Sequence, residues 1–257
     1  MGRIFITGSS DGLGMMAAKL MIQQGHQVVL HARNQDRAEE ALQANPKSEA
    51  VLTGDLASIS ETIDLAKEVN KLGRFDAVIH NAAVGYRESR KIMTIDGLPH
   101  VFAINSLSPY ILTALIEKPK RLIYMSSGLH RDGDSSLNDL FWEQRNWNGF
   151  QAYADSKLHN VLLAFAIAGK WKDVASNALE PGWVATKMGG AGAPDSLADA
   201  PVTQVWLASS MDNDALKSGG YYYHKKPQTV HPDARNTDIQ EMFMNKCAEI
   251  SGIALPE

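Results

Sequence analysis

The stretch that decides the fold is Thr7-Gly8-Ser9-Ser10-Asp11-Gly12-Leu13-Gly14. It follows an apolar run at 3–7 and opens a helix-like segment at 12–24. Its glycines permit a tight turn and a close approach of the backbone to a phosphate at a helix N-terminus. The spacing G-x3-G-x-G is weak evidence alone, and its place directly after a strand is what strengthens it. A nucleotide is therefore the expected ligand.

Beyond this turn, strand-like and helix-like segments alternate along the chain. Strands are expected at 3–7, 27–32, 49–53, 77–80, 121–125, 174–179 and 220–223. Helices are expected at 12–24, 35–44, 58–71, 98–116, 150–170, 199–210 and 233–250. This alternation predicts right-handed crossovers and a parallel sheet covered on both faces. We expect one doubly wound, Rossmann-like α/β domain over 1–257, with about seven strands.

Composition and charge limit the kinds of molecule that the protein is expected to bind. The 257 residues carry a net charge of −4 with no cluster of Lys and Arg, which argues against nucleic acid or an anionic membrane. The longest apolar run, 161–168, is too short to cross a bilayer, and the first residues lack a signal-peptide core, so a cytoplasmic protein is expected. The single Cys247 excludes an internal disulfide and is expected to be a quiet surface or helix thiol. The scattered His residues indicate no metal site.

The end of the second expected strand, Ala32-Arg33, bears on the choice of cofactor. A dinucleotide fold that prefers NAD places an acid here to hold the ribose 2′-hydroxyl, whereas Arg suits a 2′-phosphate. Arg33 therefore points to NADP(H). Asp11 opposes this, because an acid near the adenosine phosphate would repel it. Alternatively, Arg33 merely caps an exposed turn.

Tyr153 and Lys157 stand four residues apart in an expected helix, so both side chains lie on one face. A nearby ammonium that favours the phenolate would tune the phenol for proton transfer. The same spacing is common on solvated helices. Its significance depends on the remaining motifs.

Together these residues resemble the short-chain dehydrogenase/reductase family, from Arg3 to about Gly252. The further matches are Asp55-Leu56, His80-Asn81-Ala82-Ala83, Asn105, Ser127 and Pro181-Gly182-Trp183-Val184-Ala185-Thr186. His80 and Ala83 replace the family's first Asn and final Gly, which leaves the role of Asn81 intact and puts the local backbone path in question.

The resemblance implies a hydride-transfer site. Tyr153 would exchange a proton with the substrate oxygen, and Ser127 would hydrogen-bond that oxygen. Lys157 would favour the phenolate and hold the nicotinamide ribose, and Asn105 would position Lys157 through a bound water. Besides Tyr153 and Lys157, the implied cofactor-binding residues are Gly8, Ser10, Asp11, Gly12, Leu13, Gly14, Arg33, Asp55, Leu56, Asn81, Ala82, Ala83, Pro181, Gly182, Val184 and Thr186.

The segment between Ser127 and Tyr153 suggests a branch of the family and a substrate class. The two residues are 26 positions apart, and 128–151 contains Trp142, Trp147 and Phe150. With Thr94–Gly97 and Gly219–Tyr221, this resembles retinol-dehydrogenase-like, NADP-dependent reductases. The small-residue segment 187–194 predicts a mobile lid near 187–200, and the aromatic residues predict walls for an apolar aldehyde or ketone. Alternatively, the two tryptophans only pack beneath a long loop.

The apolar run 161–168 continues the Tyr153 helix and would need cover on its outer face, so a homodimer or homotetramer is expected. Burial under the 128–151 insert would produce the same sequence.

Two rival functions are also considered. A catalytically silent NADP-binding sensor could keep this fold. Gly8–Gly12 also satisfies G-x-S-x-G, which would make Ser10 the nucleophile of a serine hydrolase.

Overall fold

A single mixed sheet runs through the protein, whose computed structural model describes residues 1–256. Its strands are β1 (Arg3–Ile6), β2 (Gln27–Ala32), β3 (Ala50–Thr53), β4 (Ala77–His80), β5 (Arg121–Met125), β6 (Ala175–Leu179), β7 (Tyr221–Tyr223) and β8 (Lys226–Pro227). Their order is β3-β2-β1-β4-β5-β6-β7-β8, and every neighbouring pair is parallel except β7 and β8. The predicted Rossmann-like α/β fold is confirmed.

The eighth strand was not predicted. It is antiparallel to β7 and follows a two-residue turn in which His224 and Lys225 both have positive φ, at 48° and 62°. Such a turn usually signals itself through Asn-Gly or Gly-Gly, which tolerate positive φ. Because His and Lys occupy these positions, the sequence gives no sign of the hairpin.

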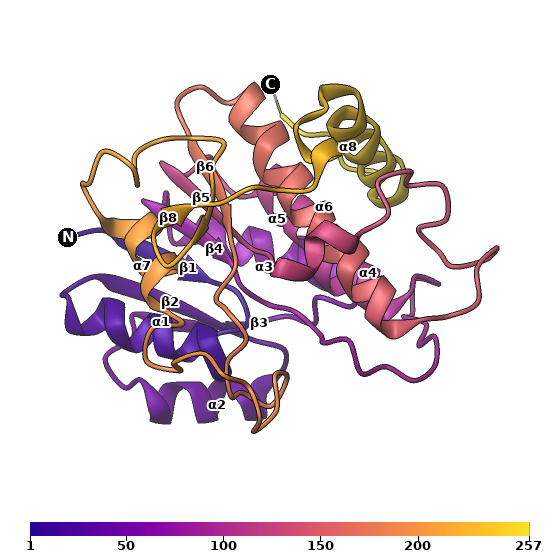
Figure 1. The fold of residues 1–257 in the computed structure, drawn as a ribbon. Coiled ribbons are helices and arrows are strands. Elements are labelled where there is room, and N and C mark those ends of the chain that lie inside the picture. Colours follow the sequence, from indigo (N-terminus) through magenta and orange to yellow (C-terminus); the bar gives the residue numbers. More distant parts are fainter. Residues whose placement is uncertain (257) are drawn as a thin grey trace.

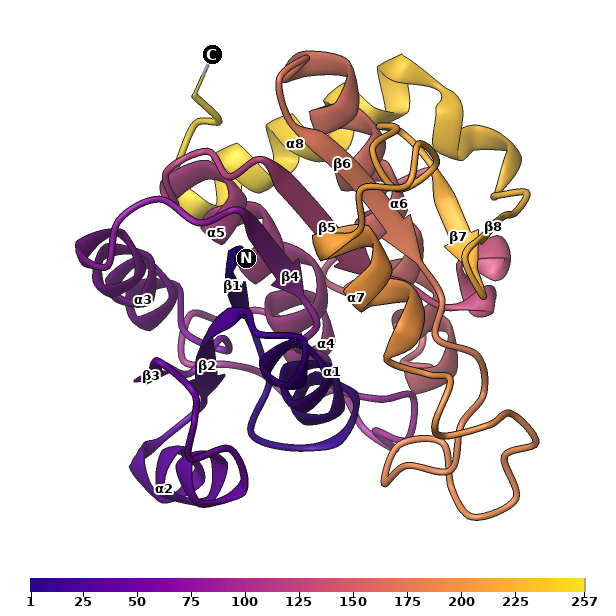
Figure 2. The same cartoon turned by 90° about the vertical axis from the view of Figure 1, so that its left-hand side faces the viewer.

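Helices cover both faces of the sheet (Figures 1 and 2). One face carries α1 (Gly12–Gln23), α2 (Gln35–Ala44) and α7 (Val202–Ser209). The other carries α3 (Ile59–Lys71), α5 (Ser108–Leu115) and α6 (Gly149–Lys170), with α8 (Thr237–Ser251) packed outside α6. Short helical turns at α4 (His100–Phe102), η2 (Gly128–Asp132) and η3 (Pro232–Arg235) complete the chain.

The long helix expected at 98–116 is interrupted. After α4 the chain forms a π-helical turn, η1 (Ala103–Leu107), which contains Asn105, and only then continues as α5. Pro109 lies at the start of α5 and has no N–H to donate to the carbonyl of Asn105, which breaks the regular ladder at this point. Single π turns of this kind recur at functional sites.

The apolar run of α6 is covered within the chain. Phe165 is buried, and α8 contributes the buried Phe243 and Cys247 to the same core. The cover therefore comes from the same chain, from α8 and from the 128–151 insert, whose Leu137 belongs to the same core. Since one subunit covers this face, the run no longer supports a homo-oligomer, whose existence stays a prediction. Cys247 is a buried helix thiol, and burial raises its pKa.

The carboxyl ends of the strands share one edge of the sheet, so the predicted site segments after β1, β2, β4, β5 and β6 meet there. The strand order reverses at β1, which has β2 on one side and β4 on the other. A ligand crevice is expected at such a reversal. In the described part of the chain, no helix is long and apolar enough to cross a membrane.

Candidate active site

The turn after β1 depends on close backbone contacts. Gly8 has φ +61°, and a Cβ there would lie 2.7 Å from the Cα of Ala82. At Gly14 a Cβ would lie 2.5 Å from the Nδ2 of Asn81. Asp11 caps α1 by accepting the Gly12 N–H at 2.7 Å. The glycines therefore seat the turn against the loop after β4 and leave the N-terminus of α1 open to an anion.

Asn81 joins this turn to β4. Its side-chain amide donates to the carbonyls of Thr7 and Gly8 at 3.0 and 3.1 Å, and its own N–H donates to the Thr7 hydroxyl at 3.0 Å. The Ala82 N–H donates to the same hydroxyl, and Ala83 follows directly. Asn81 thus takes its expected place although His80 replaces the family's preceding Asn.

His31, at the end of β2, is a supporting residue that the sequence reasoning missed. The Gly8 N–H donates to its Nδ1 at 2.9 Å, and its Nε2 lies 2.9 Å from the Gly54 carbonyl. Burial lowers the pKa of His31 to about 4, which keeps the ring neutral, as this pair of contacts requires. The signal was a lone His in an otherwise apolar strand.

Basic side chains surround Asp11. Arg37, in the first turn of α2, lies 3.1 Å from its carboxylate, and the Lys187 ammonium lies 2.5 Å from it. The hydrogen bond with Lys187 is the main cause of the lowered pKa of Asp11. Arg33 is exposed at the end of β2. Because Asp11 is already paired, its charge opposes a bound phosphate less than the sequence suggested. Arg37 was missed, although it stands four residues after Arg33.

Asp55 and Leu56 follow β3. The Asp55 carboxylate accepts the Ala57 N–H at 2.9 Å, and the Asp55 N–H donates to Glu61 at 2.8 Å. Leu56 is buried in the core beside α5. These contacts shape the loop after β3, and a direct contact of either side chain with adenine stays a prediction.

Tyr153, Lys157 and Ser127 come together at the centre of the edge. The Lys157 Nζ lies 5.2 Å from the centre of the Tyr153 ring and donates to the Met125 carbonyl at 3.0 Å. Burial raises the pKa of Tyr153, and hydrogen bonding with Ser127 partly opposes this. Burial also lowers the pKa of Lys157 to about 7. In the protein alone, burial therefore dominates, and the expected stabilisation of the phenolate by an ammonium does not.

Asn105 anchors the back of this group. Its side chain accepts the Val84 N–H at 2.8 Å and donates to the Val84 carbonyl and the Ser156 hydroxyl, each at 3.0 Å. Asn105 thus ties the π turn to the loop after β4 and to the residue preceding Lys157. Its predicted water-mediated link to Lys157 stays a prediction.

His130 supports the Ser127 loop and was also missed. Its Nδ1 lies 2.7 Å from the Ser127 carbonyl, and its Nε2 accepts the His231 N–H at 3.3 Å. Burial lowers its pKa to about 4. The neutral ring therefore donates through Nδ1 to the serine loop and ties it to the C-terminal region.

The segment after β6 turns back on itself. Gly182 has φ +86°, and the Trp183 N–H donates to Asp195 at 2.5 Å. The Thr186 hydroxyl accepts the Gly189 N–H at 3.1 Å, and Val184 forms an isolated bridge with Asp195. One compact loop therefore contains Pro181, Gly182, Val184 and Thr186. The Lys187 side chain links this loop to Asp11 through an ion pair. The mobility of the lid stays a prediction.

The aromatic residues before α6 divide into two groups. Trp142 is buried, and its ring centre lies 5.1 Å from that of Trp147, which matches the packing alternative. Phe150 is exposed and lies beside Tyr86, whose ring centre is 5.6 Å from that of Tyr153. Tyr86, on the loop after β4, was not singled out from the sequence, because nothing local distinguishes it.

Ser10 lacks the surroundings of a hydrolytic nucleophile. Its hydroxyl accepts from Arg37 at 3.5 Å, and both ring nitrogens of the nearby His31 are engaged by Gly8 and Gly54. Among the described residues, this nearby His is therefore not placed to act as a base for Ser10. Within residues 1–256 no group of three or more His, Cys, Asp or Glu side chains could hold a metal ion.

Comparisons with known proteins agree with this geometry. The model of short chain dehydrogenases matches residues 3–128. An uncharacterized oxidoreductase of Emericella nidulans is 49% identical over 261 residues, which cover 100% of this chain and 99% of that protein. Retinol dehydrogenase 13 of Mus musculus is 27% identical over 287 residues, covering 98% and 84%. A crystal structure of an uncharacterized Mycobacterium paratuberculosis protein, 22% identical, has a TM-score of 0.85 over 100% of this chain and 96% of its own.

Proposed function

Because this chain belongs to the short-chain dehydrogenase/reductase family, we propose that it is an NADP(H)-dependent oxidoreductase acting on an apolar aldehyde or ketone, or the corresponding alcohol. The observation that carries the proposal is the grouping of Ser127, Tyr153 and Lys157 beside the glycine turn. The serine hydrolase and the silent sensor gain no comparable support.

The residues at the edge fit a dinucleotide. Gly8 and Gly14 let the turn pack closely against the loop after β4, and nothing of the protein lies within 4 Å of a Cβ built at Gly12. The N-terminus of α1 would offer N–H groups to a pyrophosphate. Arg33 and Arg37, at the end of β2 and the start of α2, offer guanidinium groups to a 2′-phosphate. Bound NADP(H) would supply or accept the hydride.

The protein's own groups handle the proton and the oxygen. In the reducing direction the Tyr153 hydroxyl gives a proton to the substrate oxygen as the carbonyl carbon is reduced. Ser127 donates a hydrogen bond to that oxygen while negative charge develops on it. Lys157 accommodates the charge left on the phenol, because it lies 5.2 Å from the ring centre.

The substrate side supports an apolar molecule. Phe150 and Trp183 are large exposed aromatic residues, 46% and 56% exposed, and Phe150 lies at the Tyr86–Tyr153 pair. The name of the mouse relative, retinol dehydrogenase 13, also refers to an apolar alcohol. A planar or aromatic carbonyl compound such as 9,10-phenanthrenequinone is therefore a suitable first probe.

Cofactor choice can be tested by titration. We expect Arg33→Ala and Arg37→Ala each to weaken NADPH binding by about 10- to 100-fold, since each removes a charged hydrogen bond worth roughly 1.5–3 kcal/mol. NADH binding should change by no more than about threefold, because NADH lacks the 2′-phosphate. The matched control is Arg74→Ala, an exposed arginine before β4 at the opposite edge of the sheet. Equal losses for NADPH and NADH would contradict the proposed preference.

A further inference from the structure

The part of the molecule that the proposed chemistry leaves unexplained is the segment 133–148, which precedes α6. It contacts α6 through a polar cluster around the buried Asp155 carboxylate. The Asp155 carboxylate accepts the Asp134 N–H and the Gln151 side-chain amide, both at 2.8 Å. The Arg145 guanidinium donates to its second oxygen at 3.2 Å.

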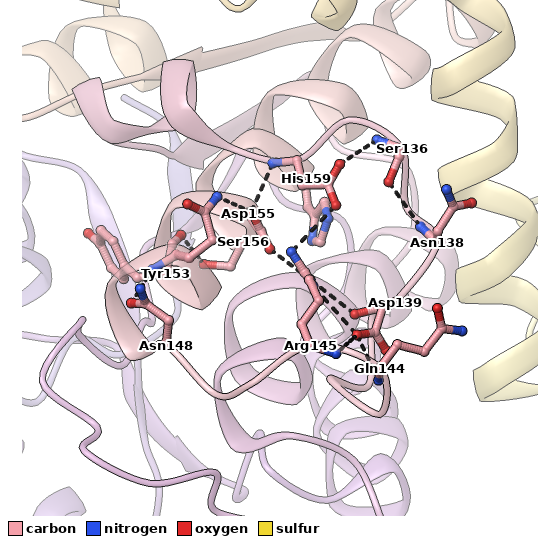
Figure 3. Close-up of polar contacts among 12 residues, drawn as sticks. Ser136, Asn138, Asp139, Gln144, Arg145, Asn148, Tyr153, Asp155, Ser156 and His159 are labelled. Carbon is pink, nitrogen blue, oxygen red and sulfur yellow. Dashed lines mark hydrogen bonds and ion pairs between the residues drawn. The ribbon is translucent and has the colours of Figure 1, made fainter.

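Asp155 faces away from the reacting groups. At 100° per residue it stands about 200° around the helix from Tyr153, on the opposite side. Figure 3 shows this arrangement, with Tyr153 on one side of α6 and Arg145 with Asp139 on the other. Arg145 can therefore affect the reacting groups only through residues that connect the two sides of α6.

A continuous path around the helix exists. The Arg145 guanidinium carbon lies 4.0 Å from the centre of the Trp142 ring, and that ring packs edge-on against Trp147 at 5.1 Å. The Trp147 Nε1 donates to the Glu88 carbonyl at 2.8 Å, in the loop after β4. The first two contacts lie within the segment 133–148, and the third joins this segment to a loop 59 residues away in the sequence.

The same loop returns to the catalytic helix. Tyr86 lies two residues before Glu88, and its ring packs edge-on against Tyr153, with centroids 5.6 Å apart. The path thus begins at Asp155 and ends at Tyr153, two residues apart on α6, and encircles the N-terminal part of the helix. We call the seven residues Tyr86, Glu88, Trp142, Arg145, Trp147, Tyr153 and Asp155 the helix ring.

We propose that the helix ring positions Tyr153, and that Arg145 and Trp147 are positioning residues for proton transfer although neither touches the reacting atoms. The proposal rests on the proposed function of Tyr153. Arg145 ties the segment 133–148 to the back of α6, and Trp147 holds the loop that presses Tyr86 onto the Tyr153 ring. Together they hold the phenol in place and shield it from water.

Two variants open the ring at different points. Arg145→Met with Asp155→Asn removes the ion pair at Asp155 without leaving a carboxylate there, whose isolation would destabilise the protein. Asp139 also loses Arg145, but its carboxylate keeps three backbone N–H donors. Trp147→Phe keeps an aromatic ring beside Trp142 and removes only the donor to Glu88. The matched control is Arg235→Met, because Arg235 also packs over an α6 ring, Phe165, at 4.7 Å but lies outside the helix ring.

The first measurement is the pKa of the Tyr153 phenol. With 3-fluorotyrosine at position 153, fluorine NMR follows the phenol's pKa in the full-length protein without cofactor. Tyr86, Ser127 and Lys157 are the polar or titratable groups that face this phenol in the wild type, and none of them is altered. Opening the ring admits water, so both ring variants should lower that pKa by about one unit, while Arg235→Met leaves it unchanged.

Turnover gives the second readout. With NADPH and 9,10-phenanthrenequinone, kcat should fall about tenfold or more in both ring variants, whereas the KM for NADPH stays within about twofold. A wild-type protein that does not reduce the probe would refute the proposed function, and the NMR titration would still decide the ring. If the ring variants and Arg235→Met lose thermal stability alike while the phenol's pKa and kcat stay unchanged, the positioning role is refuted.

Discussion

The turn after β1 and the segment 133–148 both border the catalytic residues, but they are held in different ways. The turn is held by close packing of the Gly8 backbone against Ala82 and by short side chains that bond its backbone groups, chiefly Asn81 and His31. The segment 133–148 is held by long side chains, chiefly Arg145 and Trp147. Close backbone packing leaves little room for change in the turn, whereas the side-chain contacts of the segment 133–148 can be removed one at a time by substitution.

A large effect is expected at Lys157, which lies on α6 between the turn and the segment 133–148. Lys157→Met should lower kcat by about a hundredfold or more, because proton transfer loses a neighbouring charged group. Purified variant and wild type are compared with NADPH and a carbonyl probe at saturating concentrations. A loss of less than about threefold would show that Lys157 lies near the reaction without taking part in it.

Lys157→Met should also change how the free energy of unfolding depends on pH. The pKa of Lys157 is about 7 in the folded protein and 10.5 without burial, so between these values the unfolded chain binds more protons. Wild-type unfolding free energy should therefore gain about 2 kcal/mol from this residue between pH 7 and pH 9. Urea unfolding of Lys157→Met should lack this gain and show a more stable protein at pH 7.

His31 tests the backbone-held turn. Its pKa is about 4 when folded and 6.5 without burial, so its contribution to stability is complete above pH 6.5 and is lost as the pH falls toward 4. The loss should amount to about 3 kcal/mol, and His31→Gln should remove it from the acid limb. The control is the exposed His224. Equal acid limbs in wild type and His31→Gln would mean that His31 is not buried as described.

A smaller difference separates two glycines of the same turn. Gly8 and Gly12 both have positive φ, at +61° and +52°, but only a Cβ at Gly8 meets a neighbour, while nothing lies within 4 Å at Gly12. Gly12→Ala should cost about 1 kcal/mol of unfolding free energy for the left-handed backbone alone. Gly8→Ala should cost roughly 1–2 kcal/mol more, because Ala82 must move. Equal costs would contradict the close seating of the turn.

Most of the sheet and its helices could be predicted from the sequence because the apolar periods are local. The segment 27–32 coincides with β2 and 35–44 with α2. The hairpin at His224-Lys225 and the π turn at Asn105 could not, since neither has the usual residue signal. The packing of α8 on α6 could not be predicted either, since no local pattern reveals which helix α8 contacts.

Some residues of the candidate site could be predicted from the sequence, and others could not. Tyr153, Lys157 and the glycine turn lie in short patterns whose spacing reflects one helix face or one tight turn, so their grouping was predictable. Tyr86 contacts Tyr153 across 67 residues of sequence, and Arg145 bonds Asp155 across the insert before α6, but the sequence surroundings of both residues are ordinary. Such contacts become visible only when the fold places the segments side by side.

The central claim is that Tyr153 exchanges the proton during hydride transfer. Its most direct test is the loss of nicotinamide absorbance when the protein is mixed with NADPH and 9,10-phenanthrenequinone, measured for wild type and Tyr153→Phe. We expect turnover by the wild type and a loss of about 10²- to 10⁴-fold in Tyr153→Phe, with NADPH affinity preserved. Undiminished turnover by a properly folded Tyr153→Phe would contradict the claim.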